Sequence, residues 1–331
     1  MKRNASVSWS TSDVIDQFIS FLENLGFERS RLGSVMGDGR RHRVFVRTAK
    51  GRLVRDGVYC LYLDGWPAGW AQCHAGGGEL QTWRYTPTVG QRFDDRAIIA
   101  LRQQEARAAA ERAVERAREC GQAQARAATI LGRSQPASPD HPYLARKGIR
   151  PHGVCAYREM LIVPVRNINN MLMSLQLIRG DGSKIFLRGG MTDGGMHVLG
   201  NIDQRTIVLI GEGFSTMATC REATGLPAVI SFNCGNLPRV AASIRKRYPL
   251  APIIICADDD WRTRRPNGEL YNPGIEAARK AAACGRALIA YPDWAGQRPD
   301  KATDFNDLAL GEGLSAVTSA ILRAGKDTGA A

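Results

Sequence analysis

The sequence predicts an α/β protein whose C-terminal part is a doubly wound parallel sheet. Between residues 206 and 295, short apolar runs alternate with segments of helical spacing. That alternation is typical of parallel strands joined by crossover helices. Two of the runs, at 206–210 and 252–257, end in acidic residues. Because such sheets bind ligands at the carboxyl ends of their strands, we expect the functional site at this edge.

Composition and charge favour a nucleic-acid partner. The 331 residues include 45 Lys and Arg against 32 Asp and Glu, which gives a formal net charge of +13. Such a basic balance favours a polyanion. No apolar stretch approaches the ~20 residues of a membrane-spanning helix, and polar residues follow Met1 where a secretory segment would be apolar. We therefore expect a cytoplasmic protein with no membrane partner.

The eight cysteines contain no C-x-x-C pair. In a cytoplasmic chain we expect them to be reduced residues that fill the core. The nearest approach to a zinc site is Cys73-His74, and adjacent residues cannot both face one ion comfortably. No zinc is therefore expected.

Residues 1–95 are expected to form a small α+β module. Apolar residues recur at helical spacing over 12–25, with Ser12 or Asp13 placed to cap the helix. Short alternating runs over 42–85 then indicate a β-meander. The turns between these runs contain glycine and lie at 49–51, 63–65 and 76–78.

The N-terminal module also carries aromatic and basic residues that suit single-stranded DNA. Aromatic faces can stack bases while guanidinium groups neutralise phosphates. The candidates for this contact are Arg43, Arg47, Trp66 and Trp70, with Trp83 as a further aromatic residue. The tryptophans of so small a sheet can equally serve as its core, and this alternative stays open.

Four further segments follow the module. Residues 96–133 are rich in Ala, Arg, Glu and Gln, which predicts a long exposed linker helix. Residues 134–204 form a basic unit, with a hairpin of two strands, 160–165 and 172–178, and a third strand from Lys184. The last two segments are the α/β domain at 205–310 and a C-terminal helix and tail at 311–331.

The chemistry is expected at Glu212, Asp258 and Asp260. Uncompensated carboxylates at neighbouring strand ends repel each other unless a cation lies between them, and oxygen ligands suit Mg²⁺ or Mn²⁺. This pattern predicts metal-dependent phosphoryl transfer. Acids after a strand also cap helices or turns. For Asp259, whose side chain is expected to point away from its neighbours, that structural role stays open.

The spacing from Glu212 to the pair Asp258 and Asp260 resembles the Toprim domain shared by bacterial-type primases, topoisomerases and some nucleases. In that family the Glu and the two outer Asp residues hold the metals. Asp304 resembles a further acid of the primase branch, which implies a place at the metal site. The family glycine that closely follows the Asp pair is here Gly274, after an inserted stretch at 261–273.

From about residue 35 to 310 the chain resembles the Toprim primases of plasmids, phages and integrative elements. Residues 134–204 resemble the subdomain that precedes Toprim in those enzymes, where basic residues bind template and nucleotide. The resemblance gives this role to Arg146, Lys147, Lys184 and Arg188. His141 and His197 are expected to be structural, as lone histidines near turns usually are.

The resemblance implies an enzyme of the DNA-directed RNA polymerase type, a primase that makes short RNA primers on single-stranded DNA from NTPs. It implies Mg²⁺ or Mn²⁺ as cofactor. No P-loop motif is present, so we expect the replicative helicase to be a separate chain. Two alternatives stay open. One is a Toprim nuclease that uses the same acids for water attack, and the other is a non-catalytic protein that binds or loads single-stranded DNA.

Overall fold

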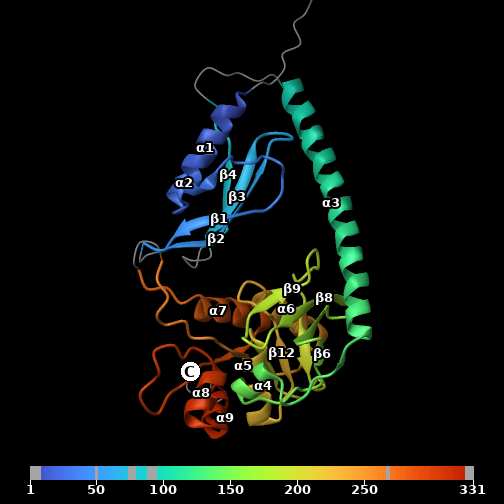
Figure 1. The fold of residues 1–331 in the computed structure, drawn as a ribbon, viewed down its shortest axis with the longest axis vertical. Helices are drawn as coiled ribbons and strands as arrows, with labels where there is room; N and C mark the ends of the chain where they lie inside the picture. Colours follow the sequence, from blue (N-terminus) through green and yellow to red (C-terminus); the bar gives the residue numbers. More distant parts are fainter. Residues whose placement is uncertain (1–8, 49–50, 74–79, 88–94, 266–268, 325–331) are drawn as a thin grey trace, which may run out of the picture. The chain divides into compact units, whose positions relative to one another are not determined.

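Figure 1 shows the computed structural model of the chain, which describes residues 9–48, 51–73, 80–87, 95–265 and 269–324. Contacts within the chain divide it into two compact units. The first holds Met1–Glu115 with Arg262–Tyr271, and the second holds Arg116–Trp261 with Asn272–Ala331. Among the described residues, no helix is both long and apolar enough to cross a membrane.

The first unit is built on an antiparallel sheet of four strands in the order β1-β2-β3-β4. The strands are β1 (His42–Arg47), β2 (Leu53–Tyr62), β3 (Ala68–Cys73) and β4 (Gln81–Arg84). Each strand pairs with the next along the chain, so the predicted β-meander is confirmed. The predicted turns at 49–51 and 76–78 lie partly or wholly outside the described residues.

Two helices precede this sheet, α1 (Thr11–Asn24) and α2 (Arg29–Leu32). One face of α1 buries Phe18 and Leu22 in the core of the sheet. The helix begins slightly earlier than predicted. Its N-cap is Ser10, which makes no side-chain hydrogen bond to the helix, so the predicted capping by Ser12 or Asp13 is wrong.

The long helix predicted from the Ala-rich composition is α3 (Asp95–Gly132). Near its C-terminal end, Ala123 and Ala127 are fully buried. Ala127 packs with Ile162 and Leu175 of the next sheet. One face of the last turns of α3 is therefore packed while the rest stays exposed, because small alanine side chains let a helix approach a sheet closely even without a broad apolar stripe.

The second sheet is antiparallel, in the order β5-β6-β7-β8-β9. Its strands are β5 (Gln135–Pro136), β6 (Cys155–Tyr157), β7 (Met160–Arg166), β8 (Leu172–Ile178) and β9 (Lys184–Phe186), and the helix α4 (Pro142–Lys147) lies between the first two in the chain. The β7–β8 hairpin forms where predicted. Its turn is held by the Asn167 carboxamide, which accepts hydrogen bonds from the backbone N–H groups of Asn169 and Met171.

The third sheet has the order β10-β12-β11-β13-β14. Its strands are β10 (His197–Leu199), β11 (Val208–Gly211), β12 (Ala228–Ile230), β13 (Ile253–Cys256) and β14 (Leu288–Ala290). The last four are parallel, as predicted. β10, where no strand was predicted, is an antiparallel edge strand that pairs with β12.

Helices cover both faces of the third sheet. They are α5 (Phe214–Thr224), α6 (Leu237–Arg247), α7 (Pro273–Gly285), α8 (Phe305–Glu312) and α9 (Leu314–Arg323). Side chains of α5, α8 and α9 share one buried cluster with the sheet, and those of α6 and α7 share another. The doubly wound α/β fold is therefore confirmed, and the carboxyl ends of its parallel strands meet at one edge.

Candidate active site

The parallel register brings the predicted acids to one edge of the third sheet. Ile210 of β11 lies opposite Ile255 of β13. Glu212 therefore stands level with Ala257, and Asp258 follows at once. These residues leave the sheet where its hydrogen bonding ends, so their side chains can face a ligand while their backbones stay anchored.

Burial and mutual repulsion act on all three acids. Burial, and then the charges of Glu212, Asp304 and Asp260, raise the pKa of Asp258 well above its usual value. Burial, and then Asp260, raise the pKa of Glu212 to about 7. The pKa of Asp260 is also raised, mainly by burial. Because the three carboxyl groups are buried near other acids, each of them ionises less readily than a free carboxyl group.

The donor set at this edge fits a divalent cation. Asp258 Oδ1 is buried and has no hydrogen-bond partner, and an oxygen in that state is costly unless a cation or a proton satisfies it. Carboxylate oxygens are the ligands that Mg²⁺ and Mn²⁺ prefer. Within the described ranges, however, no three acidic, histidine or cysteine side chains already form a group that could hold a metal.

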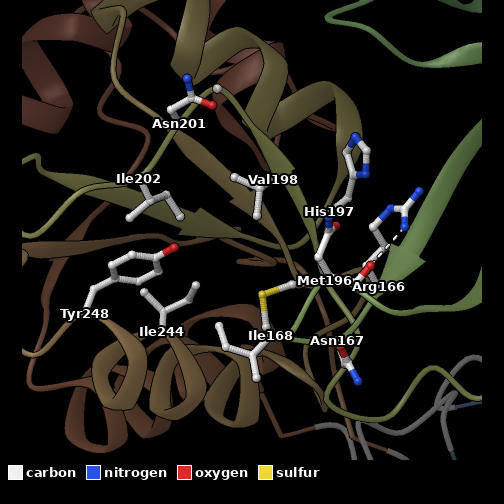
Figure 2. Close-up of a pocket in the computed structure, with 12 residues that line it drawn as sticks. Arg166, Asn167, Ile168, Met196, His197, Val198, Asn201, Ile202, Ile244 and Tyr248 are labelled. Atoms are coloured by element: carbon white, nitrogen blue, oxygen red, sulfur yellow. Dashed lines mark hydrogen bonds between the residues drawn. The ribbon is translucent and has the colours of Figure 1, made fainter.

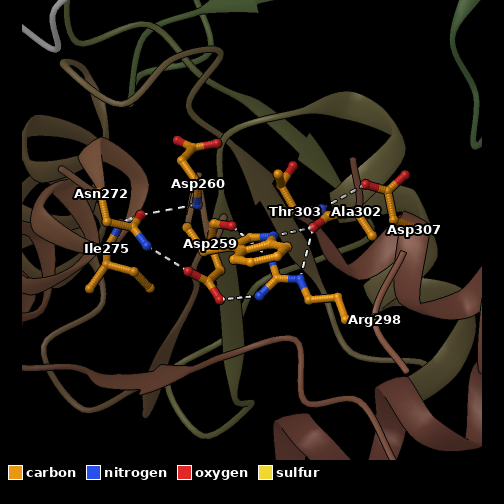
Figure 3. A network of polar contacts seen from close by, with 9 residues as sticks. Asp259, Asp260, Asn272, Ile275, Arg298, Ala302, Thr303 and Asp307 are labelled. Carbon is orange, nitrogen blue, oxygen red and sulfur yellow. Dashed lines mark hydrogen bonds and ion pairs between the residues drawn. The ribbon is translucent and has the colours of Figure 1, made fainter. Parts of the chain in front are cut away.

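Asp259 differs from its two neighbours because its partners are structural (Figure 3). Its carboxylate accepts hydrogen bonds from Arg298 Nη1 and from Asn272 Nδ2. The carboxamide of Asn272 also accepts from the backbone N–H groups of Asp260 and Ile275, so it caps α7 and ties the acidic triplet to that helix. The structural alternative for Asp259 is therefore supported.

The family glycine keeps its close approach despite the insert. A Cβ added to Gly274 would lie 2.1 Å from the backbone oxygen of Asp258. Only glycine allows the start of α7 to lie so near the acidic triplet. The inserted stretch therefore leaves the packing behind Asp258 in place.

Asp304 is the N-cap of α8. Its Oδ1 accepts from the backbone N–H of Asp307, and its Oδ2 accepts from the hydroxyl of Thr216. Both oxygens thus have partners. Its charge still reaches the site, since it contributes to the raised pKa values of Asp258 and Asp260.

Of the four predicted basic residues, Lys184 lies beside the acids. Its charge acts to lower the pKa values of Glu212 and Asp258, and its Nζ lies 3.8 Å from where a Cβ on Gly213 would stand. Arg146 donates instead to the backbone oxygen of Gly180.

The other two basic residues have contacts of their own. Lys147 Nζ lies 3.8 Å from Asp307 Oδ1. The Arg188 backbone oxygen accepts from Arg126, and its side chain is exposed. The structure therefore does not bring the four predicted basic residues, Arg146, Lys147, Lys184 and Arg188, together at one point.

The aromatic residues of the N-terminal sheet divide into two groups. Trp83 packs in the core beside Phe18. Trp70 lies on the opposite face, where the guanidinium of Arg41 stands 5.5 Å from its ring centre. Trp66 donates through Nε1 to the backbone oxygen of Tyr85. Trp83 therefore belongs to the core, as the alternative held, and DNA binding by Trp66 and Trp70 stays a prediction.

The predicted arginines lie on β1. The alternation of the strand puts Arg43 and Arg47 on the face away from the buried Val44 and Val46. Arg47 donates to the carboxylate of Glu28. Arg43 lies 3.9 Å from the carboxylate of Asp56. His74, which entered the zinc prediction, lies outside the described residues.

A pocket of about 470 Å³ lies away from the acidic triplet, between β10 and α6 (Figure 2). His197 lines it, and burial lowers the pKa of this histidine to about 4. Its Nδ1 lies 3.1 Å from the backbone oxygen of Pro164, which a neutral ring can donate to. His141 caps α4 by accepting from the backbone N–H of Tyr143. Both histidines thus have backbone partners, which supports the structural role expected for them.

Sequence reasoning missed two residues that hold the acidic triplet, Asn272 and Arg298. Asn272 stands directly before Pro273, a pair that signals a helix start and could have suggested a cap. Arg298 lies in a loop without regular pattern, and nothing in the sequence connects it with Asp259.

Comparisons with known proteins identify relatives but no family model that matches. A DNA primase TraC of Escherichia coli is 30% identical over 290 residues, which are 85% of this chain and 26% of that protein. A second DNA primase TraC of Escherichia coli is 33% identical over 268 residues, 78% of this chain and 18% of that protein. The chain thus spans about a quarter or less of these relatives, and the predicted resemblance to primases is confirmed.

Solved structures of primases are similar at lower levels. The primase fragment of the bacteriophage T7 primase-helicase has a TM-score of 0.40 and 15% identity, over 57% of this chain and 75% of that chain. The zinc-binding and RNA polymerase domains of Aquifex aeolicus primase have a TM-score of 0.42 and 11% identity, over 96% of this chain and 86% of that chain. Because these scores are low, the fold assignment rests on the strand order.

Proposed function

We propose that this chain, which resembles DNA primase TraC over most of its length, synthesises short RNA primers on single-stranded DNA from NTPs. The reaction would serve replication of a plasmid, phage or integrative element. The observation that carries the proposal is the buried, unpartnered oxygen of Asp258 beside Glu212 and Asp260. A divalent cation would satisfy such a group, and cations at a strand edge suit nucleotidyl transfer.

Glu212, Asp258 and Asp260 would hold two Mg²⁺ or Mn²⁺ ions. When bound, these ions supply charge neutralisation and favour deprotonation of the initiating 3′-hydroxyl. The three side chains would have to turn toward shared points, because no such group is already formed in the described part of the chain. Asp304 would serve the metals by its charge, since both of its oxygens already accept hydrogen bonds.

The basic residues would neutralise what the metals leave uncompensated. A triphosphate carries more negative charge than two divalent ions balance, and the remaining charge needs fixed cations. Lys184 would bind the triphosphate, because it already lies beside Gly213 and its positive charge acts to lower the pKa of Glu212. Arg146, Lys147 and Arg188 would contact template or nucleotide from the same unit.

Single-stranded DNA would also bind the N-terminal sheet. Its outer face carries Arg43 and Trp70, a guanidinium group and an aromatic ring of the kind that holds phosphates and bases. Arg47 and Trp66 would belong to the same contact surface. The replicative helicase would act as a separate chain.

One assay separates this proposal from its rivals. The purified protein is incubated with single-stranded DNA, labelled NTPs and Mg²⁺ or Mn²⁺, and products are resolved on a gel. Short RNA that depends on the template supports the primase. Shortened or nicked DNA without incorporation supports the Toprim nuclease, and retained but unchanged DNA supports a binding or loading protein.

A further inference from the structure

Two phenylalanines stand beside the acidic site, and neither has a role in the account above. Phe186 ends β9, and Phe232 follows β12. Their ring centres are 5.8 Å apart, and the rings meet edge to face at 79°. This is a favourable arrangement of two aromatic rings, so the pair is a packed unit rather than two independent side chains.

Both rings are tied to the catalytic edge. The backbone N–H of Phe232 donates to the backbone oxygen of Glu212 at 2.9 Å. Phe186 lies two residues after Lys184, so the alternation of the strand puts the two side chains on the same face of β9. Lys184 Nζ lies beside Gly213. The aromatic pair is therefore a neighbour of the lysine and the glutamate.

The backbone of Phe232 is unusual. Its φ is +72°, in the left-handed region that a bulky side chain rarely adopts. Strain of this kind persists only when the surroundings impose it, and it gathers at functional sites. Here the left-handed residue is the one that carries its ring to Phe186.

Phe186 is exposed where a core role would bury it. Its side chain is 36% exposed, on a short strand at the end of its sheet. In an edge-to-face pair Phe232 covers at most one face of the Phe186 ring, so Phe232 leaves the other face to further contacts. Flat aromatic faces accept nucleobases, and stacking tolerates every base.

We infer that Phe186, packed against Phe232, stacks the base of the incoming nucleotide while Lys184 binds its triphosphate. The inference rests on the proposed function. Side chains two positions apart on a strand, such as those of Lys184 and Phe186, are separated by about 6.6 Å. A nucleotide spans such a distance between its phosphates and its base. Phe186 would be a positioning residue for the base, and it would confer no choice between bases.

Binding of nucleotides to the full chain tests this without requiring turnover. Affinities for Mg²⁺-bound ATP and for ribose 5-triphosphate, which lacks a base, are measured by calorimetry. Phe186→Ala is expected to weaken ATP binding about 5- to 30-fold and to leave ribose triphosphate unchanged. Phe186→Trp should retain ATP affinity, and Phe186→Leu should fall between, which separates a stacking role from misfolding.

Two neighbours on the same strand are matched controls. Ile185 is 41% exposed but points to the opposite face, so Ile185→Ala should change neither affinity. Lys184→Ala should weaken both ligands, because both carry the triphosphate. Equal effects of Phe186→Ala on both ligands, no effect on either, or no ATP binding by the wild-type protein would overturn the inference.

Two further measurements tell which molecule supplies the base on the ring, and whether the stacking site and the primase function stand or fall separately. If Phe186→Ala weakens binding of an oligothymidylate but not of ATP, the base on the ring belongs to the template and the inference is wrong. Primer synthesis by the wild-type protein is measured independently. Phe186-dependent ATP binding without RNA synthesis would remove the primase proposal and keep the stacking site. RNA synthesis together with ATP binding that does not depend on Phe186 would keep the primase proposal and remove the stacking site.

Discussion

Arg298 holds Asp259 at two points. Nη1 donates to the carboxylate oxygen Oδ2, and Nη2 donates to the backbone oxygen of the same residue at 2.8 Å. Nε of Arg298 also donates to the backbone oxygen of Ala302 (Figure 3). One guanidinium group thus compensates the middle acid and fixes the peptide between Asp258 and Asp260, the two acids proposed to hold metal.

Replacing Arg298 by Lys should lower primer synthesis while the protein stays folded. Lysine keeps the charge, but its three donors share one nitrogen and cannot reach the separated acceptors that the planar guanidinium group spans, so the acidic triplet would shift. Small shifts of this kind can cost about 10- to 100-fold in rate. The measurement is the rate of labelled NTP incorporation at saturating Mg²⁺. Arg323→Lys, in the exposed ion pair with Asp293, is the matched control and should change nothing. An unchanged rate for Arg298→Lys would mean that the clamp has no part in catalysis.

Replacing Asp260 by Asn and replacing Asp259 by Asn should change the stability of the protein in opposite directions. Asp260→Asn removes a carboxylate whose pKa is raised by burial, so the metal-free protein should melt at a higher temperature near pH 8. Asp259→Asn leaves Arg298 without its charged partner and should lower the free energy of unfolding by about 1 to 3 kcal/mol. Thermal unfolding in the presence of a chelator compares them. The same direction of change in both variants would contradict the division between metal ligands and a structural acid.

Binding of a divalent cation should release protons in a pH-dependent way. The pKa of Glu212 is raised to about 7, so the folded protein keeps a proton that the unfolded chain has lost. The protein therefore loses stability through Glu212 as the pH rises from the ordinary pKa of a glutamate toward 7. Mn²⁺ must displace that proton, so calorimetry in two buffers should show more proton release near pH 6 than near pH 8. Glu212→Gln should reduce the difference, with Asp258 and Asp260, whose pKa values are also raised, supplying the rest, and a difference equal to that of the wild-type protein would rule out Glu212 as a ligand.

His197 should make the protein less stable in mild acid. Burial lowers its pKa from 6.5 to about 4, so the unfolded chain takes up a proton first as pH falls through this window. The stability that the neutral ring contributes is present above about 6.5 and is lost toward 4. Because the residue keeps some contact with water, we expect a loss of about 2 kcal/mol rather than the full effect. Urea unfolding at several pH values measures it. His197→Asn, which can still donate to Pro164, should flatten the slope, and a slope equal to that of the wild-type protein would show that another group titrates.

Much of the third sheet could be predicted from the sequence, because buried parallel strands leave continuous apolar runs such as Ile253–Cys256. β10 could not, since three residues are too few for a pattern and its pairing with β12 joins distant parts of the chain. The acids at the strand ends were predictable for the same reason as the strands. That Asp304 is a helix cap was not distinguished, because a cap and a ligand can show the same residue after the same kind of loop.

The support of the site was beyond sequence reasoning. Arg298 and Asp259 are 39 positions apart, and their pairing depends on the fold. The left-handed backbone of Phe232 is likewise invisible in a run that reads as ordinary strand. Local patterns therefore predict which residues reach the edge of the sheet, and long-range contacts decide which of them have partners there.

Template-dependent incorporation of labelled NTPs by the wild-type protein and by Asp260→Asn is the most direct measurement of the central claim. We predict short RNA from the wild-type protein that requires both Mg²⁺ or Mn²⁺ and single-stranded DNA. We expect at least about a 100-fold loss in the folded variant, as for removal of a metal ligand. No RNA from the wild-type protein, or RNA made equally well by both proteins, would contradict a primase whose metals are held by these acids.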